Sequence, residues 1–493
     1  MHLQWHHYRY YPYERGLALR EAQSVLRPSS IREDDDGICV EKPTAPDDVV
    51  RLVYFATATH DATQTVATHQ SILERANGNG LNRQATRYSV HGLHEYKGKF
   101  NPQVAKALLN IFSADRGDCV LDPFCGSGTS LVECAQLGIK AVGTDVNPLA
   151  VFLANAKLKS LGIRAGDLKG AIAGARRRMA GSRSSPPKDD RTAYLQSWFS
   201  PGILEVIESV RSAFESLDGD AGQIGLAIAS NLLRDYSLQE PRDLRIRRRK
   251  SALPEISFLN ALERAVEAYC SRLGSAQETL GVASSAGCAI HLDCRELSGS
   301  RIEMPGAFDL AITSPPYATA LPYIDTQRLS LVWLGLLKPE EVLDLEASLV
   351  GSREIRGGRR KDLLIALETN AAQIPAAEQD FCIRLQGALG KDDGFRRVAV
   401  PRLLYRYFAA MADSFTAVRR LMKPNAPFAL IVGRNHTVLG GKRFQVDTPA
   451  HLASIAVSRG WRHQETMELQ TYRRFGLHRS NATSSEALVI LRA

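Results

Sequence analysis

The sequence has no long apolar stretch. Its longest largely apolar segment, residues 329–337, spans nine positions, whereas a helix that crosses a membrane needs about 20 apolar residues. The N-terminal segment MHLQWHHYRYYPYERG is polar and aromatic, and it lacks the apolar core of a secretory signal. We therefore expect a cytoplasmic protein that has no membrane partner.

The sequence also lacks the cysteine patterns of metal sites and disulfide frameworks. None of its eight cysteines forms a C-x-x-C pair or combines with a histidine at zinc-finger spacing. We expect reduced, mostly buried cysteines and no metal site. Hydrophobic residues make up 44% and charged residues 23% of the chain, which is ordinary for a globular protein and argues against disorder.

Size and charge set broad limits on the class of protein. A chain of 493 residues predicts about two to four domains, or fewer domains enlarged by insertions. The 62 Lys and Arg residues exceed the 53 Asp and Glu residues, and the formal net charge is +9. This excess weakly favours an anionic partner such as nucleic acid, because many basic proteins bind none.

Apolar segments with strand character alternate with helical segments over much of the chain. We predict strands over residues 119–122, 140–145, 289–292, 309–313, 428–433 and 487–491, and helices over residues 104–113, 130–137, 148–159 and 403–422. This alternation predicts an α/β fold with a mostly parallel sheet. A helical block, 161–287, and a polar block, 338–400, read as insertions. Residues 271–287 are small and predict a loop.

A glycine-rich turn follows the first predicted strand. In DPFCGSGT (122–129), Gly126 and Gly128 let the backbone approach a ligand closely, because glycine has no Cβ. The next strand ends at Asp145, 19 residues after Gly126, where an acidic side chain can accept hydrogen bonds from ribose hydroxyls. The strand, the turn and the acid together favour a nucleoside site over a purely structural turn.

The residues around the turn narrow the choice of cofactor. Position 131 is Leu, so the dinucleotide pattern G-x-G-x-x-G is incomplete, and no G-x-x-x-x-G-K pattern for ATP is present. Asp122, beside the turn, would repel a pyrophosphate but suits a cationic amino-acid group. We therefore predict S-adenosylmethionine, which carries an ammonium and a sulfonium group.

A second motif, SPPY (314–317), follows the predicted strand 309–313. Ligands of open α/β sheets bind beyond the strand ends, so this loop should face the same crevice as the glycine-rich turn. Pro315 and Pro316 stiffen the loop and remove two N–H donors, which leaves the Ser314 hydroxyl and nearby carbonyls as acceptors for an exocyclic amino group. Tyr317 offers an aromatic face on which a base can stack. A plain β-turn is the alternative.

Together, DPFCGSGT (122–129) and TSPPY (313–317) resemble the DNA amino-methyltransferases, the N4-cytosine and N6-adenine group. The resemblance covers roughly residues 91–160 and 288–335 and, more loosely, 402–492. It implies a Rossmann-like SAM-methyltransferase sheet with helical insertions. It also implies flipping of the target base and direct displacement at the sulfonium methyl, without a metal.

The resemblance assigns two groups of site residues. The catalytic loop would consist of Ser314, Pro315, Pro316 and Tyr317. In the second group, residues 91–103 would close over the methionine part of the cofactor, Asp145 would bind the ribose and Asp293 the adenine amino group. The whole cofactor-binding group would be Lys99, Phe100, Pro102, Asp122, Phe124, Gly126, Gly128, Asp145 and Asp293.

The same resemblance divides the chain into four regions. We expect an N-terminal region of unknown role (1–85), a cofactor-binding half (86–160), a helical insertion that is a candidate for DNA contact (161–287), and a catalytic half (288–493) that contains the polar insertion. Two basic segments could contact phosphates or form solvated loops: Arg242, Arg245, Arg247, Arg248, Arg249 and Lys250, and Arg353, Arg356, Arg359, Arg360 and Lys361.

The resemblance thus implies a site-specific DNA methyltransferase of restriction-modification type. It also implies action on cytosine N4, because Ser in the family's first catalytic position, here Ser314, leans towards cytosine. N6-adenine methylation and methylation of guanine N2 in RNA are alternatives with the same machinery. A protein-glutamine methyltransferase and a non-catalytic DNA-binding relative are less favoured, because Ser precedes P-P-Y and the cofactor positions are intact. The predicted partners are double-stranded DNA and a cognate restriction endonuclease.

Overall fold

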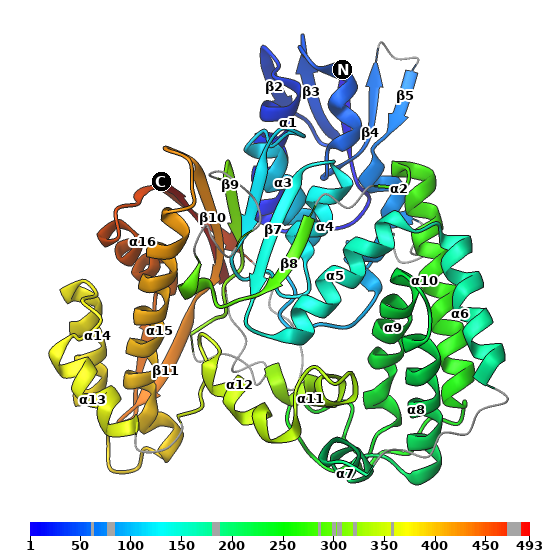
Figure 1. Cartoon of the computed structure of the whole chain (residues 1–493). Coiled ribbons are helices and arrows are strands. Elements are labelled where there is room, and N and C mark those ends of the chain that lie inside the picture. The colour runs from blue at the N-terminus through cyan, green and yellow to red at the C-terminus, as the bar shows by residue number, and fades with distance from the viewer. Residues whose placement is uncertain are drawn as a thin grey trace.

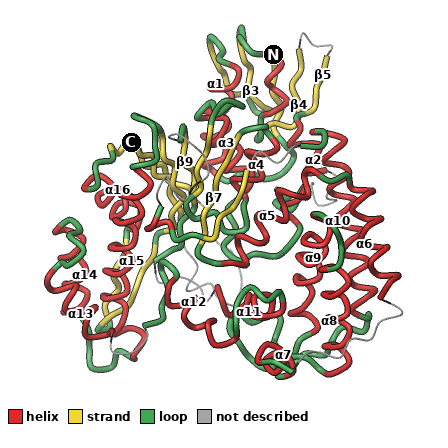
Figure 2. Tube along the Cα trace, in the orientation of Figure 1, coloured by secondary structure: helices red, strands yellow, loops and turns green. Residues whose placement is uncertain are grey.

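A seven-stranded sheet forms the centre of the computed structural model (Figures 1 and 2). The structure describes the whole chain except residues 61–63, 76–83, 180–187, 284–286, 298–301, 303–307, 319–322, 356–358 and 471–484. The strands are β6 (Cys119–Asp122), β7 (Lys140–Asp145), β8 (Gly287–His291), β9 (Leu310–Thr313), β10 (Pro427–Gly433), β13 (Arg462–Gln470) and β14 (Ser485–Arg492). Their order is β13-β14-β10-β9-β6-β7-β8. The strands from β10 to β8 are parallel, and β14 runs antiparallel to both of its neighbours.

Helices cover both faces of this sheet. On one side lie α3 (Pro102–Ile111), α4 (Thr129–Gln136) and α5 (Pro148–Gly162), and on the other lie α15 (Phe395–Arg419) and α16 (Thr448–Ser458). In β9, Leu310 and Ile312 join the first core, whereas Ala311 joins the second. Successive strand residues point to opposite faces, so a strand that is buried on both faces is apolar throughout. The predicted α/β, Rossmann-like sheet is confirmed.

The N-terminal region forms a second, antiparallel sheet, which projects at the top of Figure 1. Its strands are β1 (His2–Trp5), β2 (Ser30–Glu33), β3 (Gly37–Glu41), β4 (Phe55–His60) and β5 (Gln64–Ala67), in the order β2-β3-β1-β4-β5, with helices α1 (Pro12–Leu26) and α2 (His69–Arg75). Leu3 and Leu17 share a core with Leu108 of α3. An ion pair of 2.6 Å joins Arg20 of α1 to Glu465 of β13. The sequence predicted neither this sheet nor a role for the region.

The first insertion is helical, as predicted. It contains α6 (Ala165–Met179), α7 (Asp190–Gln196), α8 (Pro201–Glu215), α9 (Asp220–Tyr236) and α10 (Phe258–Leu280), which form the block on the right of Figure 1. The prediction of a loop over 271–287 was wrong for its first part, because α10 continues to Leu280. Leu273 and Ala276 continue the buried face that Val266 and Tyr269 begin, and this helical spacing outweighs the small residues around it.

The polar block 338–400 also contains helices. After α11 (Tyr323–Trp333) come α12 (Val342–Ser348), α13 (Arg359–Thr369) and α14 (Ala376–Gly387), and a hairpin of β11 (Asn435–Leu439) and β12 (Lys442–Val446) lies farther along the chain. Leu367, Cys382 and Leu385 are buried in the core that also contains α15, so this insertion is packed against the catalytic half. Among the described residues, no helix combines the length and the apolarity that a membrane crossing requires.

Candidate active site

Three neighbouring parallel strands end at the same edge of the central sheet. Asp122 is the last residue of β6, Asp145 of β7, and Thr313 of β9. The Thr313 hydroxyl donates a hydrogen bond of 2.7 Å to Asp122 Oδ1. The structure therefore brings together the glycine-rich turn and the SPPY loop, which are almost 200 residues apart in the sequence.

The glycine-rich turn depends on both of its glycines. Gly126 and Gly128 have φ values of +49° and +80°, which favour glycine. A Cβ at Gly128 would lie 2.7 Å from the Ala154 Cβ, so the turn packs on α5 only with glycine at this position. The Gly126 N–H donates to Asp145 Oδ2 at 3.0 Å. This bond joins the turn to the acid at the end of the next strand.

Two carboxylates lie beside this turn, of which Asp122 is buried and Asp145 is half-buried. Burial raises the pKa of Asp122 to about 6 and that of Asp145 to about 6, and the charge of Asp145 adds to the shift of Asp122. Asp122 accepts hydrogen bonds from the N–H of Phe124 and the hydroxyl of Thr313, and Asp145 accepts from the N–H of Gly126 and Asn147. The region has excess negative charge, which a ligand that donates hydrogen bonds or carries a cation would relieve.

Lys157 of α5 donates hydrogen bonds to the glycine-rich turn. Its Nζ donates to the Ser127 carbonyl at 2.7 Å and to the Ser127 hydroxyl at 2.9 Å, and the side chain is fully buried. Burial lowers the pKa of Lys157 well below its usual value. Sequence analysis assigned no role to this residue. A lysine inside the apolar helix PLAVFLANAKLKSLG was the signal that could have identified it.

The segment 91–103 is anchored on α4, and its side chains contact other parts of the protein. Buried His91 contacts Glu133 at 2.6 Å, and burial lowers the pKa of His91 to about 4. Lys99 donates to the carbonyls of Thr86 and His91 rather than to the turn. The ring of Tyr96 faces the turn instead, 3.4 Å from where a Cβ at Gly126 would lie. Sequence analysis gave Tyr96 no role.

Phe100 and Pro102, the other residues of this segment that were predicted to bind the cofactor, pack within the fold. Half-buried Phe100 packs against the large core of the cofactor half. Pro102 is the buried first residue of α3, and the Asn101 side chain caps that helix. In the turn itself, Phe124 packs against the opposite core, next to β6.

The SPPY loop is held by segments from the far end of the chain. The Ser314 hydroxyl donates to the Ile431 carbonyl of β10 at 3.2 Å, and the Tyr317 hydroxyl donates to Glu486 of β14 at 2.6 Å. A Cβ at Gly351, where φ is +78°, would lie 2.6 Å from the Tyr317 carbonyl oxygen. The second insertion therefore lies directly against the predicted catalytic loop, a contact that no local sequence pattern indicates.

Asp293 follows β8 and lies beside the end of β7, because the N–H of the preceding residue, Leu292, donates to the Asp145 carbonyl. Its carboxylate makes charged hydrogen bonds to Arg295, one of them of 2.9 Å to Nε. Burial raises the pKa of Asp293, but the bonds from Arg295 outweigh this effect and lower it overall. Asp293 thus lies near the strand end that carries Asp145, with an arginine partner that the sequence did not predict.

The residues around the turn fit S-adenosylmethionine in the character of their polar groups. Half-buried Asp145 can accept hydrogen bonds from ribose hydroxyls, and buried Asp122 is suited to a cationic amino-acid group. The positive φ values of Gly126 and Gly128 favour glycine at both positions of the turn. These features were the basis of the prediction from sequence, and the structure places them together.

Known proteins are similar to this chain in its cofactor half and, more weakly, over most of its length. A family profile described as DNA methylase matches residues 41–156. The type II methyltransferase M.MvaI of Kocuria varians is 25% identical over 379 residues, which are 72% of this chain and 78% of the relative. The type II methyltransferase M.MjaII of Methanocaldococcus jannaschii is 44% identical over 75 residues, 15% of this chain and only 14% of that protein.

Two further comparisons give a short match in sequence and a weak match in structure. A tRNA (guanine(10)-N2)-dimethyltransferase of Methanothermobacter thermautotrophicus is 38% identical over 52 residues, which are 10% of this chain and 16% of the relative. The solved structure of TrmN from Thermus thermophilus aligns with 11% identity and a TM-score of 0.35, and the alignment covers 100% of this chain and 98% of that one. The family resemblance predicted from the two motifs is confirmed by the DNA methylase and type II methyltransferase matches, and it implies S-adenosylmethionine as the methyl donor.

Proposed function

Since this chain is a relative of the DNA amino-methyltransferases, we propose that it is a site-specific DNA methyltransferase that transfers a methyl group to the exocyclic N4 of cytosine. One observation carries the proposal: the 2.7 Å hydrogen bond from Thr313 to Asp122, which couples the SPPY loop to the cofactor turn. A transferase must hold both of its substrates in line, and this bond fixes the two loops that would hold them.

The residues of the SPPY loop fit the chemistry of an amino group. The Ser314 hydroxyl uses its hydrogen in the bond to Ile431, so its oxygen can accept a hydrogen bond from the target N–H. Pro315 and Pro316 have no N–H that would compete with it. When both N–H groups of the target amine donate hydrogen bonds, its nitrogen lone pair is less delocalised into the ring. The lone pair can then point towards the methyl that S-adenosylmethionine supplies. Tyr317, oriented by Glu486, would stack on the flipped base.

Segments of both insertions flank the SPPY loop and provide a candidate surface for DNA. On one side, Gly351 packs on Tyr317. On the other, Gln239 donates to the Asp325 carbonyl in the first turn of α11, the helix that follows the loop. Gln239 and Gly351 each lie next to one of the two basic segments. This arrangement supports DNA contact by both insertions rather than by 161–287 alone.

Basic residues from three segments act on one another in this part of the molecule. Burial and the charges of Arg245 and Arg396 lower the pKa of Arg353, so both guanidinium groups lie within electrostatic range of Arg353. Beside them, Phe395 is 73% exposed, the highest value among the described large apolar side chains, with the Arg396 guanidinium 5.4 Å from its ring centre. Arginines suit phosphates, and an exposed aromatic ring suits the face or the step of a base.

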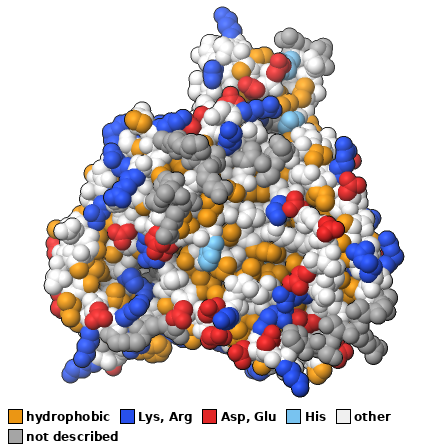
Figure 3. All heavy atoms as spheres, in the orientation of Figure 1, with side chains coloured by type: hydrophobic (Ala, Val, Ile, Leu, Met, Phe, Trp, Pro, Cys, Tyr) orange, Lys and Arg blue, Asp and Glu red, His pale blue; other side chains and the backbone are white. Residues whose placement is uncertain are grey.

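Not every residue of the two basic segments belongs to this surface. Arg247 pairs with Asp243, Arg248 stacks on Trp198 at 4.5 Å, and Arg249 donates to the Gln239 carbonyl. Arg356 lies outside the described residues. Basic and acidic side chains are interspersed along the lower part of the face in Figure 3, so we assign DNA contact to Arg245, Arg353, Phe395 and Arg396 rather than to net charge.

Two alternatives use the same machinery. N6-adenine methylation differs only in the base that the loop accepts, and Ser314 in the first catalytic position favours cytosine. Methylation of guanine N2 in RNA is supported by the similarity to tRNA (guanine(10)-N2)-dimethyltransferases. The type II designation of M.MvaI and M.MjaII supports a role in restriction-modification, with double-stranded DNA and a cognate endonuclease as partners.

Nucleoside mass spectrometry tests these choices directly. DNA and RNA from a methylation-deficient host that expresses the chain are digested, and a host that expresses Tyr317→Ala serves as the control. We expect N4-methylcytosine in the DNA of the first host alone. N6-methyladenine in DNA would change the base assignment and leave the enzyme class intact. A new N2-methylguanosine in RNA, without a DNA mark, would replace the proposal with the RNA alternative.

A further inference from the structure

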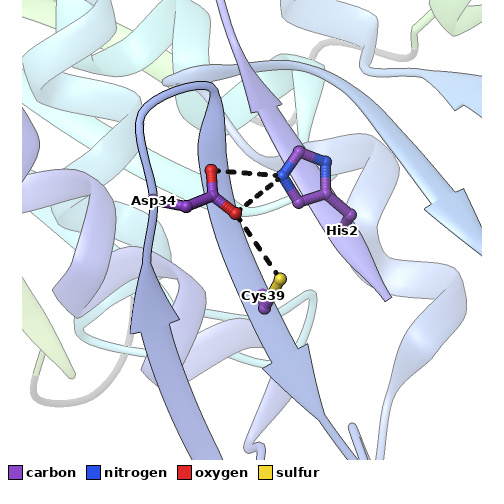
Figure 4. Close-up of side chains that lie close together, drawn as sticks. All are labelled: His2, Asp34 and Cys39. Carbon is purple, nitrogen blue, oxygen red and sulfur yellow. Dashed lines mark hydrogen bonds and ion pairs between the residues drawn. The ribbon is translucent and has the colours of Figure 1, made fainter.

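The N-terminal sheet brings together three side chains that commonly bind metal ions. His2 is on β1, Asp34 is in the turn between β2 and β3, and Cys39 is on β3, and one ligand atom of each lies within 4.8 Å of the others (Figure 4). His2 and Cys39 are direct cross-strand partners, so the pairing of β1 with β3 fixes two of the three positions. Their spacing in the sequence resembles no zinc motif, which is why the sequence predicted no metal site.

The distances within this group suit a bound ion better than a direct ion pair. The His2 Nε2 lies 3.2 Å and 3.4 Å from the two carboxylate oxygens of Asp34, and the Cys39 Sγ lies 3.6 Å from Oδ2. A charge-assisted N–H···O bond is shorter, about 2.7–2.9 Å. Metal–ligand bonds of about 2.0–2.3 Å at tetrahedral angles place neighbouring ligand atoms about 3.3–3.6 Å apart.

We propose that His2, Asp34 and Cys39 form a zinc site that clamps the N-terminal strand to the β2–β3 turn. An imidazole nitrogen, a carboxylate oxygen and a thiolate sulfur together suit Zn²⁺ rather than Mg²⁺ or Ca²⁺, which prefer oxygen ligands alone. The fourth position is left for water. Binding releases the thiol proton of Cys39 to solvent, because the metal ligand is the thiolate.

The site is accessible and is separate from the proposed methyl-transfer site. The His2 and Asp34 side chains are 35% and 42% exposed, so an ion can enter from solvent. The strand ends that carry Asp122, Asp145 and Thr313 belong to the other sheet. The zinc site therefore does not depend on the proposed function, and it would stabilise the N-terminal sheet without taking part in catalysis.

The test is metal titration of the full chain after treatment with a chelator and its removal. We expect one equivalent of ZnCl₂ to bind and to raise the melting temperature. With CoCl₂ as the probe, we expect visible absorption from a thiolate–cobalt bond. Cys39→Ser should abolish this absorption and weaken zinc binding at least tenfold, and Asp34→Asn should weaken it as well.

Two control variants separate this site from adventitious binding. Cys288 is an exposed cysteine on β8, and Cys288→Ser should retain the cobalt absorption and the zinc affinity. His7 is an exposed histidine near the N-terminus, and His7→Gln should also bind as the unchanged chain does. Equal affinity in Cys39→Ser, or loss of binding in His7→Gln or Cys288→Ser instead, would overturn the proposal.

Discussion

The cofactor turn and the SPPY loop adjoin each other, yet they are held in different ways. The turn is fixed by residues close to it in sequence: Gly126 bonds to Asp145, and Lys157 bonds to Ser127. The SPPY loop is fixed by residues much farther along the chain, since Ser314 bonds to Ile431 and Tyr317 to Glu486. Cofactor binding should therefore depend on local residues, whereas base binding should depend on the assembly of the whole catalytic half.

The largest effect that separates the two loops should come from Tyr317→Ala. Loss of the aromatic face removes a base-stacking contribution of about 1–3 kcal/mol. The loop also loses its hydrogen bond to Glu486, so we expect methyl transfer to fall below detection. Cofactor affinity, measured by calorimetry, should stay within twofold, because the turn keeps its own hydrogen bonds. Tyr317→Phe retains the ring and loses only the bond to Glu486, and it should retain measurable activity. Full activity in Tyr317→Ala would contradict the stacking role.

The opposite effect should come from Gly128→Ala, which perturbs the turn. The new Cβ would meet the Ala154 Cβ at 2.7 Å in a residue with φ of +80°, so the turn must shift. We expect cofactor affinity to fall at least tenfold and the melting temperature to fall as well. Gly166→Ala in α6 is the matched control, because a Cβ there has no heavy atom within 4 Å and alanine favours the helix. Equal cofactor affinity in the two variants would show that the turn does not bind the cofactor.

The difference between local and distant contacts also explains which features the sequence predicted. Strands β6 and β7, the turn and Asp145 follow one another within 27 residues (119–145), and each has its own signal in apolar runs or glycines. The contacts of Tyr317 with Glu486 and Gly351 have no such signal. They arise only when β14 pairs with β10 and the second insertion packs against the SPPY loop. No short segment of sequence indicates contacts over such distances.

The same reasoning applies to the side-chain contacts of the segment 91–103. Lys99 was predicted to line the cofactor pocket from its place in a family-like segment, yet its amine bonds to the carbonyls of Thr86 and His91. Tyr96, three residues earlier, is the side chain that faces the turn. A sequence pattern locates a segment well, but the direction of each side chain depends on how the segment is anchored, here by buried His91 on Glu133.

A pH titration should sharpen the comparison, because Asp122 and Asp145 on the cofactor side both have raised pKa values. Their pKa values of about 6 lie above the usual value of about 3.9 for an unfolded Asp. As the pH falls from 7 to 5, the folded chain takes up protons that the unfolded chain does not, so this contribution stabilises the cofactor-free fold. Cofactor affinity should fall over the same range, because protonated carboxyls are weaker acceptors for ribose hydroxyls and for a cation.

Asp145→Asn tests this assignment. Calorimetry from pH 5 to 7 should give a weaker cofactor affinity with a flatter pH profile in the variant, since one of the two titrating groups is gone. Melting temperatures over the same range should also change less steeply. A pH profile identical to that of the unchanged chain would mean that Asp145 does not titrate in the folded protein or does not contact the cofactor.

The smallest effects should come from the surface that we assign to DNA beside the SPPY loop. For DNA binding, log K falls as log salt concentration rises. Arg353→Ala should make this slope shallower by about 0.9, the value for one phosphate contact. Phe395→Ala should weaken DNA binding without changing that slope, because a ring releases no counterions. Lys169→Ala, on the outer side of α6 where Lys169 pairs with Glu267, should change neither quantity. If Arg353→Ala and Lys169→Ala have the same slope, DNA lies elsewhere on the protein, and the contact of the second insertion with Tyr317 serves only to hold the loop.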